Sequence, residues 1–224
     1  MFFVNGISKS FGSQQVLHNI KFEVNKGQCV ALLGINGSGK STLLNILSGN
    51  IKADSGSYGS HEPLKIAFLP QDNPLLSELT AMDNIKLWYP GSTKDIVCEK
   101  NKLLFHRLGV DSFLNKRVSK LSGGMKKRLS LAITMMSEPE LLLLDEPLAS
   151  LDILCKNGIL DYLRSYTKNG GTVIVATHES SVLDICSHIY TLKNGELKLA
   201  VDNTASGISQ RPDESYYSRL LLEN

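Results

Sequence analysis

Four short runs of the chain are apolar at nearly every position and end in polar or glycine-rich residues. They span residues 29–33, 66–69, 141–144 and 172–176. Short runs without polar alternation are typical of parallel strands that are buried on both faces. Residues 20–25 instead alternate between apolar and polar, as in a strand with one buried face. The pattern therefore predicts an α/β fold with a mainly parallel sheet and an antiparallel β portion.

Other stretches predict the connections between these strands. Residues 2–4 are apolar and predict a short first strand, whereas residues 8–14 are polar and predict a turn. Residues 54–57, rich in serine and glycine, predict another turn. Lys193-Asn194-Gly195 lies between two apolar runs and predicts a hairpin. Residues 153–166 predict a helix that ends before Gly170-Gly171.

Residues 74–137 differ from the rest, because their apolar residues recur at helical spacings and no run resembles a strand. The last helix of this stretch is expected to begin at Leu121-Ser122-Gly123-Gly124 and to stop at Pro139. We therefore predict one domain over residues 1–224. Its core comprises residues 1–73 and 138–224, and residues 74–137 form an inserted helical subdomain.

A glycine-rich loop lies between the run 29–33 and the apolar residues 43–47. Its glycines let backbone N–H groups turn towards a phosphate, and the helix that begins near Lys40 adds its positive dipole end. Lys40 supplies a cation for the outer phosphates, and the Ser41 hydroxyl can bind Mg²⁺. The loop predicts a nucleoside triphosphate site. Its expected contacts are Gly34, Asn36, Gly37, Ser38, Gly39, Lys40, Ser41 and Thr42.

Two acidic residues, Asp145 and Glu146, follow the apolar run 141–144. An aspartate at the end of such a strand can hold the hydrated Mg²⁺ opposite the phosphate loop. A glutamate one residue later can accept a proton from the attacking water. In a chain that already carries a phosphate loop, this pair predicts a hydrolytic centre.

The composition limits the remaining possibilities. A net charge of +2 gives no reason to expect nucleic acid binding, and the basic cluster Lys126-Lys127-Arg128 is interpreted as a solvated helix face. No apolar run approaches the ~20 residues that a membrane span requires. The four cysteines are scattered without metal-like spacing, so we expect reduced thiols in a cytosolic protein.

The sequence Leu121-Ser122-Gly123-Gly124 lies between the phosphate loop and the acidic pair. Alone, it would most often be a helix cap. In this order and spacing, the three motifs resemble those of the nucleotide-binding subunit of an ATP-binding cassette (ABC) transporter. The resemblance covers nearly the whole chain. It implies a P-loop NTPase core with an inserted helical subdomain, and an ATPase that uses ATP and Mg²⁺.

The resemblance also assigns roles to single residues. Gln71 resembles the glutamine that senses Mg²⁺ and the γ-phosphate, and His178 matches the histidine that contacts the γ-phosphate. Asp152 matches a loop that reaches across a dimer. Phe11 takes the place of the aromatic residue that stacks on adenine, and its alternative role is that of a core phenylalanine.

The partners follow from the same resemblance. Two chains, expected to be copies of this one, would pair head to tail. Ser122, Gly123 and Gly124 of one chain would then close over the ATP held by Lys40, Ser41 and Asp145 of the other. A transmembrane permease would hold the pair on the cytoplasmic face of the membrane, and no nucleic acid partner is expected.

Met125 follows the signature where glutamine is often found. This variant is similar to cassettes paired with ABC-2-type permeases, a group rich in exporters, so we expect export. Alternatively, Met125 only fills a gap near the helix start. The main alternative function is a soluble single-cassette ATPase in a cofactor-assembly or other non-transport complex. The sequence does not identify the substrate.

Overall fold

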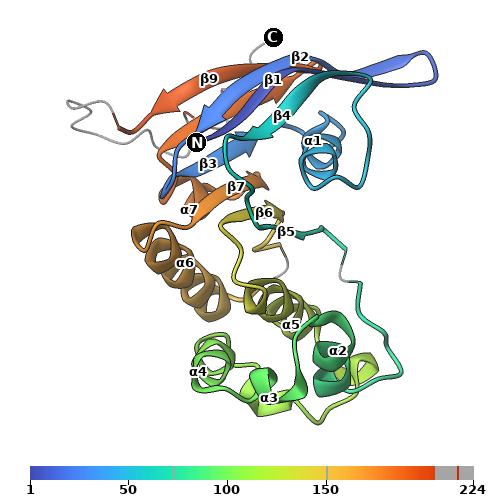
Figure 1. Ribbon diagram of the computed structural model, residues 1–224, viewed down its shortest axis with the longest axis vertical. Coiled ribbons are helices and arrows are strands. Elements are labelled where there is room, and N and C mark those ends of the chain that lie inside the picture. Colours follow the sequence, from blue (N-terminus) through green and yellow to red (C-terminus); the bar gives the residue numbers. More distant parts are fainter. Residues whose placement is uncertain (73, 150, 205–215, 217–224) are drawn as a thin grey trace.

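The computed structural model describes residues 1–72, 74–149, 151–204 and 216. Two β-sheets enclose helix α1 (Lys40–Leu47), and a group of helices lies on the far side of the larger sheet (Figure 1). The order of the strands in the larger sheet is β5-β6-β7-β3-β8-β9. The strands span Ile66–Leu69 (β5), Leu141–Asp145 (β6), Thr172–Thr177 (β7), Cys29–Leu33 (β3), His188–Lys193 (β8) and Glu196–Asp202 (β9).

Neighbouring strands from β5 to β8 are parallel, and β9 runs antiparallel to β8. The four strands predicted from apolar runs are all present. Of these, β3, β6 and β7 are buried throughout, whereas β5 lies at the edge of the sheet and Ile66 is exposed. Asn194 and Gly195 join β8 to β9 with φ angles of 50° and 77°. Positive φ at both central residues is what a type I′ hairpin turn requires. The predicted fold class and hairpin are therefore confirmed.

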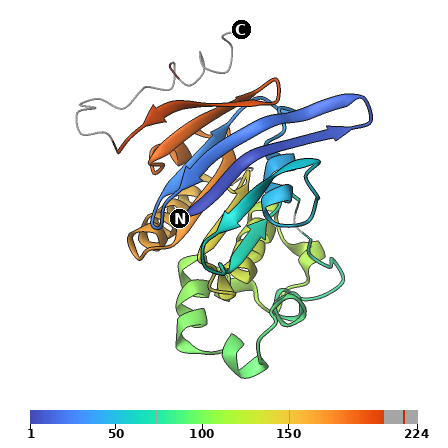
Figure 2. The ribbon, with the colours of Figure 1, turned by 45° about the horizontal axis from the view of Figure 1, so that its top comes forward.

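The smaller sheet is antiparallel in the order β2-β1-β4, with β1 at Phe2–Phe11, β2 at Gln14–Val24 and β4 at Ser55–Ser60. The β1–β2 hairpin projects from the body of the molecule (Figure 2). Two predicted turns were too long, since only residues 12–13 form the first turn and only residue 54 lies in a bend before β4. Residues 8–11 belong to β1 and residue 14 to β2, and residues 55–57 belong to β4. Backbone pairing along β1 overrides the polar composition of both stretches.

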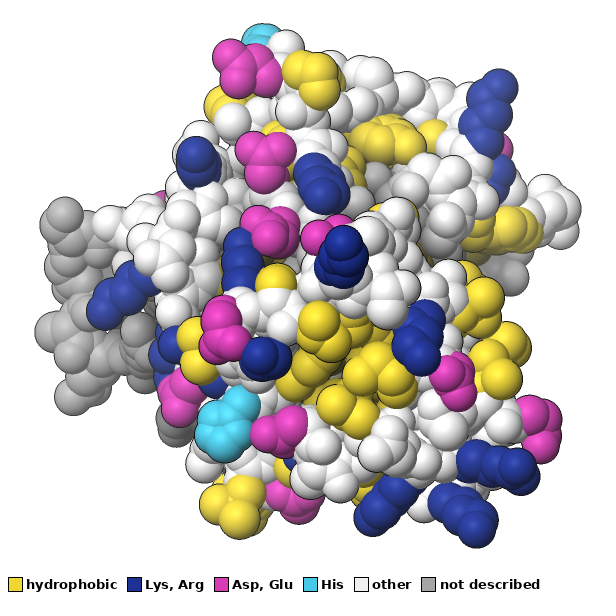
Figure 3. Space-filling view, turned by 60° about the horizontal axis from the view of Figure 1, so that its bottom comes forward, with side chains coloured by type: hydrophobic (Ala, Val, Ile, Leu, Met, Phe, Trp, Pro, Cys, Tyr) yellow, Lys and Arg dark blue, Asp and Glu magenta, His cyan; other side chains and the backbone are white. Residues whose placement is uncertain are grey.

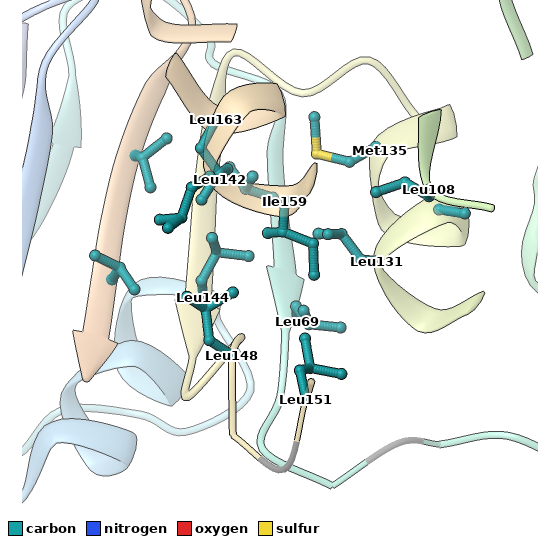
Figure 4. Close-up of a cluster of buried hydrophobic side chains, with 14 of the residues drawn as sticks. Leu69, Leu108, Leu131, Met135, Leu142, Leu144, Leu148, Leu151, Ile159 and Leu163 are labelled. Carbon is teal, nitrogen blue, oxygen red and sulfur yellow. The ribbon is translucent and has the colours of Figure 1, made fainter. Parts of the chain in front are cut away.

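Alternate residues of the central strands face opposite layers. Val30, Leu32, Leu141 and Leu143 pack against α1 and the smaller sheet. Their neighbours Ala31, Leu33, Leu142 and Leu144 pack against α5 (Gly123–Met136) and α6 (Ile153–Lys168), as Figure 4 shows for Leu142 and Leu144. This alternation explains why the strands contain so few polar residues.

The described residues between β5 and β6 form helices and no strand, apart from a single bridge between Thr80 and Arg117. These helices are α2 (Ala81–Trp88), α3 (Thr93–Ile96), α4 (Glu99–Arg107), two short 3₁₀ turns (Asp111–Phe113 and Val118–Lys120) and α5. The predicted helices at residues 121–136 and 153–166 correspond to α5 and α6. A short helix, α7 (Ser180–Leu183), follows β7. No helix in the described ranges is long and apolar enough to cross a membrane.

Candidate functional site

The glycine-rich loop joins β3 to α1 and depends on glycine at specific positions. Gly37 and Gly39 have φ angles of 82° and 105°, which residues with a side chain rarely adopt. A Cβ atom at Gly34 would lie 2.5 Å from Ser38 Oγ and 2.6 Å from the Leu192 carbonyl oxygen. No side chain caps the N-terminus of α1, so its first N–H groups stay available to an anion.

Lys40 is only 5% exposed, and its ammonium group lies against the loop. The Nζ atom donates to the carbonyl oxygens of Gly34 at 2.7 Å and Ile35 at 3.1 Å. Burial lowers the pKa of Lys40, and the carboxylates of Glu146 and Asp145 oppose that effect. Lys40 is therefore a buried cation close to two acids.

Asp145 and Glu146 lie at the end of β6 and are 2% and 6% exposed. Burial raises the pKa of Asp145, while a hydrogen bond from Ser41 and the charge of Lys40 counteract the shift. Glu146 has a φ of 47°, in the left-handed region that a non-glycine residue occupies only at a cost. His178, just after β7, has its Nδ1 atom 2.9 Å from Glu146 Oε1. The acids are thus held between α1, β6 and β7.

A cavity of about 460 Å³ brings most of the predicted site residues together. The phosphate loop forms one wall, Phe11 lies at the end of β1, and Gln71 follows β5. Phe11 is 50% exposed, so it is not a core phenylalanine. The predicted residues that line the cavity are Phe11, Asn36, Gly37, Gly39, Lys40, Ser41, Thr42, Gln71, Asp145 and Glu146.

Other predicted residues lie outside the lining of this cavity. Gly34 and Ser38 shape the loop from behind, and His178 reaches the site through Glu146. Ser122 caps α5 by accepting a hydrogen bond from the Met125 N–H. A Cβ atom added at Gly123 would meet nothing within 4 Å. Asp152 caps α6 by accepting a bond from Cys155 N–H, and its neighbour Ser150 lies outside the described residues.

The residues of the cavity fit a magnesium nucleotide. Asp145 Oδ1 and Glu146 Oε2 are buried oxygens without a hydrogen-bond partner, and both residues line the cavity together with Ser41. Buried polar atoms of this kind normally have partners. Carboxylate and hydroxyl oxygens suit Mg²⁺, which takes only one or two protein ligands beside phosphate oxygens. The described residues contain no cluster of three or more His, Cys, Asp or Glu side chains that would favour another metal.

The interpretation of the basic cluster was wrong for one residue. Lys127 is 4% exposed and donates to the carbonyl oxygens of Pro70, Gln71 and Asp145. Lys126 and Arg128 are half-buried on the same helix. The charge run concealed this burial, because every third or fourth position of a helix returns to the same face. Leu131, four residues after Lys127, is fully buried and indicates that face.

The sequence profile of the family described as "ABC transporter" matches residues 17–149, which is more than half of the chain. The chain belongs to the ABC transporter family. The predictions of an ATP-binding cassette, an ATPase and a P-loop NTPase fold are therefore confirmed. The match includes the phosphate loop, the signature and the acidic pair.

Curated relatives that match nearly the whole of this chain agree with this assignment. The chain is 31% identical to the macrolide export ATP-binding/permease protein MacB of Mannheimia succiniciproducens, over 96% of this chain and 38% of that protein. It is 32% identical to a probable sulfate/thiosulfate import ATP-binding protein, CysA, of Chlorella vulgaris, over 97% of both chains. The cassette spans about a third of the length of several curated relatives, which are longer proteins.

A solved structure has the same fold. It is the dimeric structure of an ATP-binding cassette in a post-hydrolysis state, bound to ADP and Pi. The TM-score is 0.79 at 27% identity, and the match covers 91% of this chain and 99% of the other.

Proposed function

We propose that this cassette hydrolyses ATP as the motor subunit of a membrane exporter, and that it works as a head-to-tail dimer of two copies. The observation that carries the proposal is the cavity in which Lys40, Ser41, Gln71, Asp145 and Glu146 converge. Each of these side chains has a chemical task in phosphoryl transfer. The family assignment supports the same reading.

The residues of the cavity divide the chemistry among them. Lys40 would exchange its bonds to the loop carbonyls for phosphate oxygens, and Ser41, Asp145 and Gln71 would hold Mg²⁺. Bound Mg²⁺ supplies positive charge that neutralises the phosphates. Glu146 accepts a proton from the attacking water, and His178 orients that carboxylate through the 2.9 Å contact. Phe11 offers its exposed ring to the adenine.

The cavity of one chain contains no residue of the signature. In the proposed dimer, Ser122, Gly123 and Gly124 of the partner close over the γ-phosphate, and Asp152 lies in the loop between the sites. Closure excludes water and completes the site, and hydrolysis removes the phosphate that holds the two chains together. The similar solved structure is dimeric and bound to ADP and Pi, which supports the pairing of two cassettes.

A second cavity, of about 510 Å³, offers a contact for the permease. It lies between β5, α2 and α5, and its apolar lining includes Phe68, Leu75, Trp88 and Ile133. Trp88 is 48% exposed, and Leu87 beside it is 54% exposed. Figure 3 shows hydrophobic side chains gathered on the face that the helical segment presents. An apolar permease segment seated there would place the cassette peripherally on the cytoplasmic side of a membrane.

The division of the chain is part of the proposal. We assign residues 1–73 and 138–224 to the core, and residues 74–137 to a helical subdomain that moves with the permease; residues 73, 150, 205–215 and 217–224 lie outside the described residues. Export rests on the Leu-Ser-Gly-Gly-Met signature and on the name of the macrolide exporter among the relatives. The alternative, a soluble assembly ATPase, predicts that the chain stays out of the membrane fraction of its source cells, whereas a transporter subunit would sediment with the membranes.

The decisive experiment replaces Glu146 with glutamine. The Glu146→Gln variant cannot accept the proton, so kcat for ATP should fall by about 10²–10⁴-fold. Because ATP still binds, the variant should accumulate as a dimer in the presence of ATP. Steady-state hydrolysis and analytical ultracentrifugation with and without ATP measure the two effects. Glu23→Gln, on the exposed side of β2, is the matched control. Wild-type turnover in Glu146→Gln would refute the assigned base.

A further inference from the structure

Lys127 is a buried cation on the side of the site away from the nucleotide cavity. It belongs to α5 and is 4% exposed. Its Nζ atom donates to the carbonyl oxygens of Gln71 at 3.1 Å, Pro70 at 3.2 Å and Asp145 at 3.4 Å. An ammonium group has three donors and no acceptor, so the three carbonyls use its full capacity. A buried charge is retained only with such complete pairing.

The three carbonyls come from two segments that carry two of the three proposed metal residues, Gln71 and Asp145. Pro70 and Gln71 follow β5, and Asp145 ends β6. The helix that supplies the ammonium group begins at the signature. Lys127 is therefore a direct link between the signature helix and the edge of the sheet where Gln71 and Asp145 lie.

The contact with Asp145 fixes the peptide unit that carries Glu146. The carbonyl of Asp145 and the N–H of Glu146 belong to the same planar group. Lys127 donates to the Asp145 carbonyl oxygen, and the Glu146 N–H donates to the Ala176 carbonyl at 2.9 Å. The next dihedral angle is the positive φ of Glu146, 47°. Such a conformation persists only where its surroundings over-determine it.

The neighbouring basic residues make other contacts. Arg128 donates to the Leu108 carbonyl at 3.1 Å, at the end of α4, and its guanidinium lies 5.5 Å from the centre of the Phe113 ring. Among the described residues, the Lys126 side chain makes no hydrogen bond or ion pair, which makes it a suitable control. Of these three consecutive cations, only Lys127 reaches the strands that end at the site.

We propose that Lys127 is a positioning residue, which holds the Asp145–Glu146 peptide and the Gln71 backbone to the signature helix. This inference rests on the proposed function, because it assigns catalysis to Glu146. In the dimer, α5 of one chain reaches the partner's nucleotide, while Gln71 and Asp145 serve the chain's own nucleotide. Lys127 thus joins, within one chain, parts of two different ATP sites.

The test compares Lys127→Met, Lys127→Arg and the control Lys126→Met. Methionine has a similar length but leaves three carbonyls without a donor, so the base should be misplaced while the phosphate loop stays intact. For Lys127→Met we expect kcat to fall about 10- to 100-fold and KM for ATP to change less than about threefold. Arginine can still donate to several carbonyls and should stay within about threefold of the wild type. Lys126→Met should match the wild type.

A second readout uses the nucleotide-free chain. The Glu146 amide is protected by its bond to Ala176, so its hydrogen exchange reports how firmly the peptide unit is held. Lys127→Met should speed this exchange about tenfold, and Lys127→Arg should not. If Lys127→Met does not fold, Lys127→Gln, with two donors instead of three, is measured in its place.

Specific results would overturn the inference. Unchanged kcat and unchanged Glu146 exchange in Lys127→Met would do so, as would a rise in KM at constant kcat. Lys127→Arg as impaired as Lys127→Met in both readouts would also overturn it, because donors at this position would then not be what holds the peptide. If the wild-type chain did not hydrolyse ATP, the proposed function would fail, but the exchange comparison would still decide whether Lys127 holds the peptide.

Discussion

Lys40 shows how the site is held together before a phosphate arrives. Its ammonium group donates to the carbonyls of Gly34 and Ile35, which lie in its own loop. These bonds compensate part of the cost of burying the charge. A phosphate must therefore compete with the loop for the lysine, and it does so as a charge-assisted partner, which is stronger than a neutral carbonyl. The loop and its ligand share one cation.

Removal of this cation should weaken nucleotide binding directly. In Lys40→Ala, the phosphates lose a charged donor, and we expect ATP affinity to fall by about tenfold or more. Isothermal titration calorimetry with Mg·ATP measures the change. Lys52→Ala, on an exposed residue after α1, should bind ATP as the wild type does. Equal affinity of Lys40→Ala and wild type would contradict the phosphate cradle described here.

The sequence allowed some residues of the site to be predicted and not others. The phosphate loop and the acidic pair were recognisable because each residue type at each spacing has a chemical reason. Lys127 was not, because three consecutive cations look alike in sequence, and only the packing of α5 distinguishes the buried one. The left-handed φ of Glu146 was equally invisible, since glutamate has no preference that signals it.

At the scale of elements, apolar runs predicted β3, β6 and β7 because those strands are buried on both faces. The strand β4 escaped prediction, since its sequence SGSYGS resembles a loop. It forms because β1 offers an antiparallel edge, and because glycine allows a close approach there. A Cβ atom at Gly56 would lie 2.4 Å from the backbone carbonyl atoms of Gly6. The demand for glycine comes from a strand distant in sequence, which local patterns do not show.

This close approach makes a testable claim about β4. Gly56 has a φ of 87° and lies against the backbone of Gly6, whereas Gly12 has a φ of 59° and open space where a Cβ atom would be added. Gly12→Ala should cost about 1 kcal/mol of unfolding free energy, from backbone strain alone. Gly56→Ala should cost about 3 kcal/mol, since it adds a steric clash. Urea unfolding of both variants measures the difference, and equal losses would show that β4 moves aside easily.

At the scale of the whole molecule, one chain supplies the phosphate loop and the acids of the site but not the signature. The cavity gathers the phosphate loop, Gln71 and both acids, while the signature residues at the start of α5 do not line it. The core and the helical segment are nonetheless joined by continuous packing between β6, α5 and α6. In the proposed head-to-tail dimer, the signature of an identical second chain would supply the donor groups that this cavity does not contain.

The dimer can be tested with two inactive variants. Lys40→Ala disables the phosphate loop, and Ser122→Arg places a bulky side chain in the signature, so each variant alone should have little activity. In a mixed head-to-tail dimer, one site combines the intact loop of the Ser122→Arg chain with the intact signature of the Lys40→Ala chain. The other site carries both defects. Random pairing would then restore about a quarter of the wild-type ATPase rate if the sites act independently.

The same mixture distinguishes a site completed within one chain. If Ser122 served the cavity of its own chain, every site in the mixture would carry one defect, and mixing would restore nothing. The measurement is the ATPase rate of an equimolar mixture against each variant alone, at a concentration where the wild type is dimeric. Far-UV circular dichroism confirms that both variants are folded. Recovery of activity on mixing is a demanding criterion, because each variant alone is inactive. Activity can return only if one site takes its loop from one chain and its signature from the other.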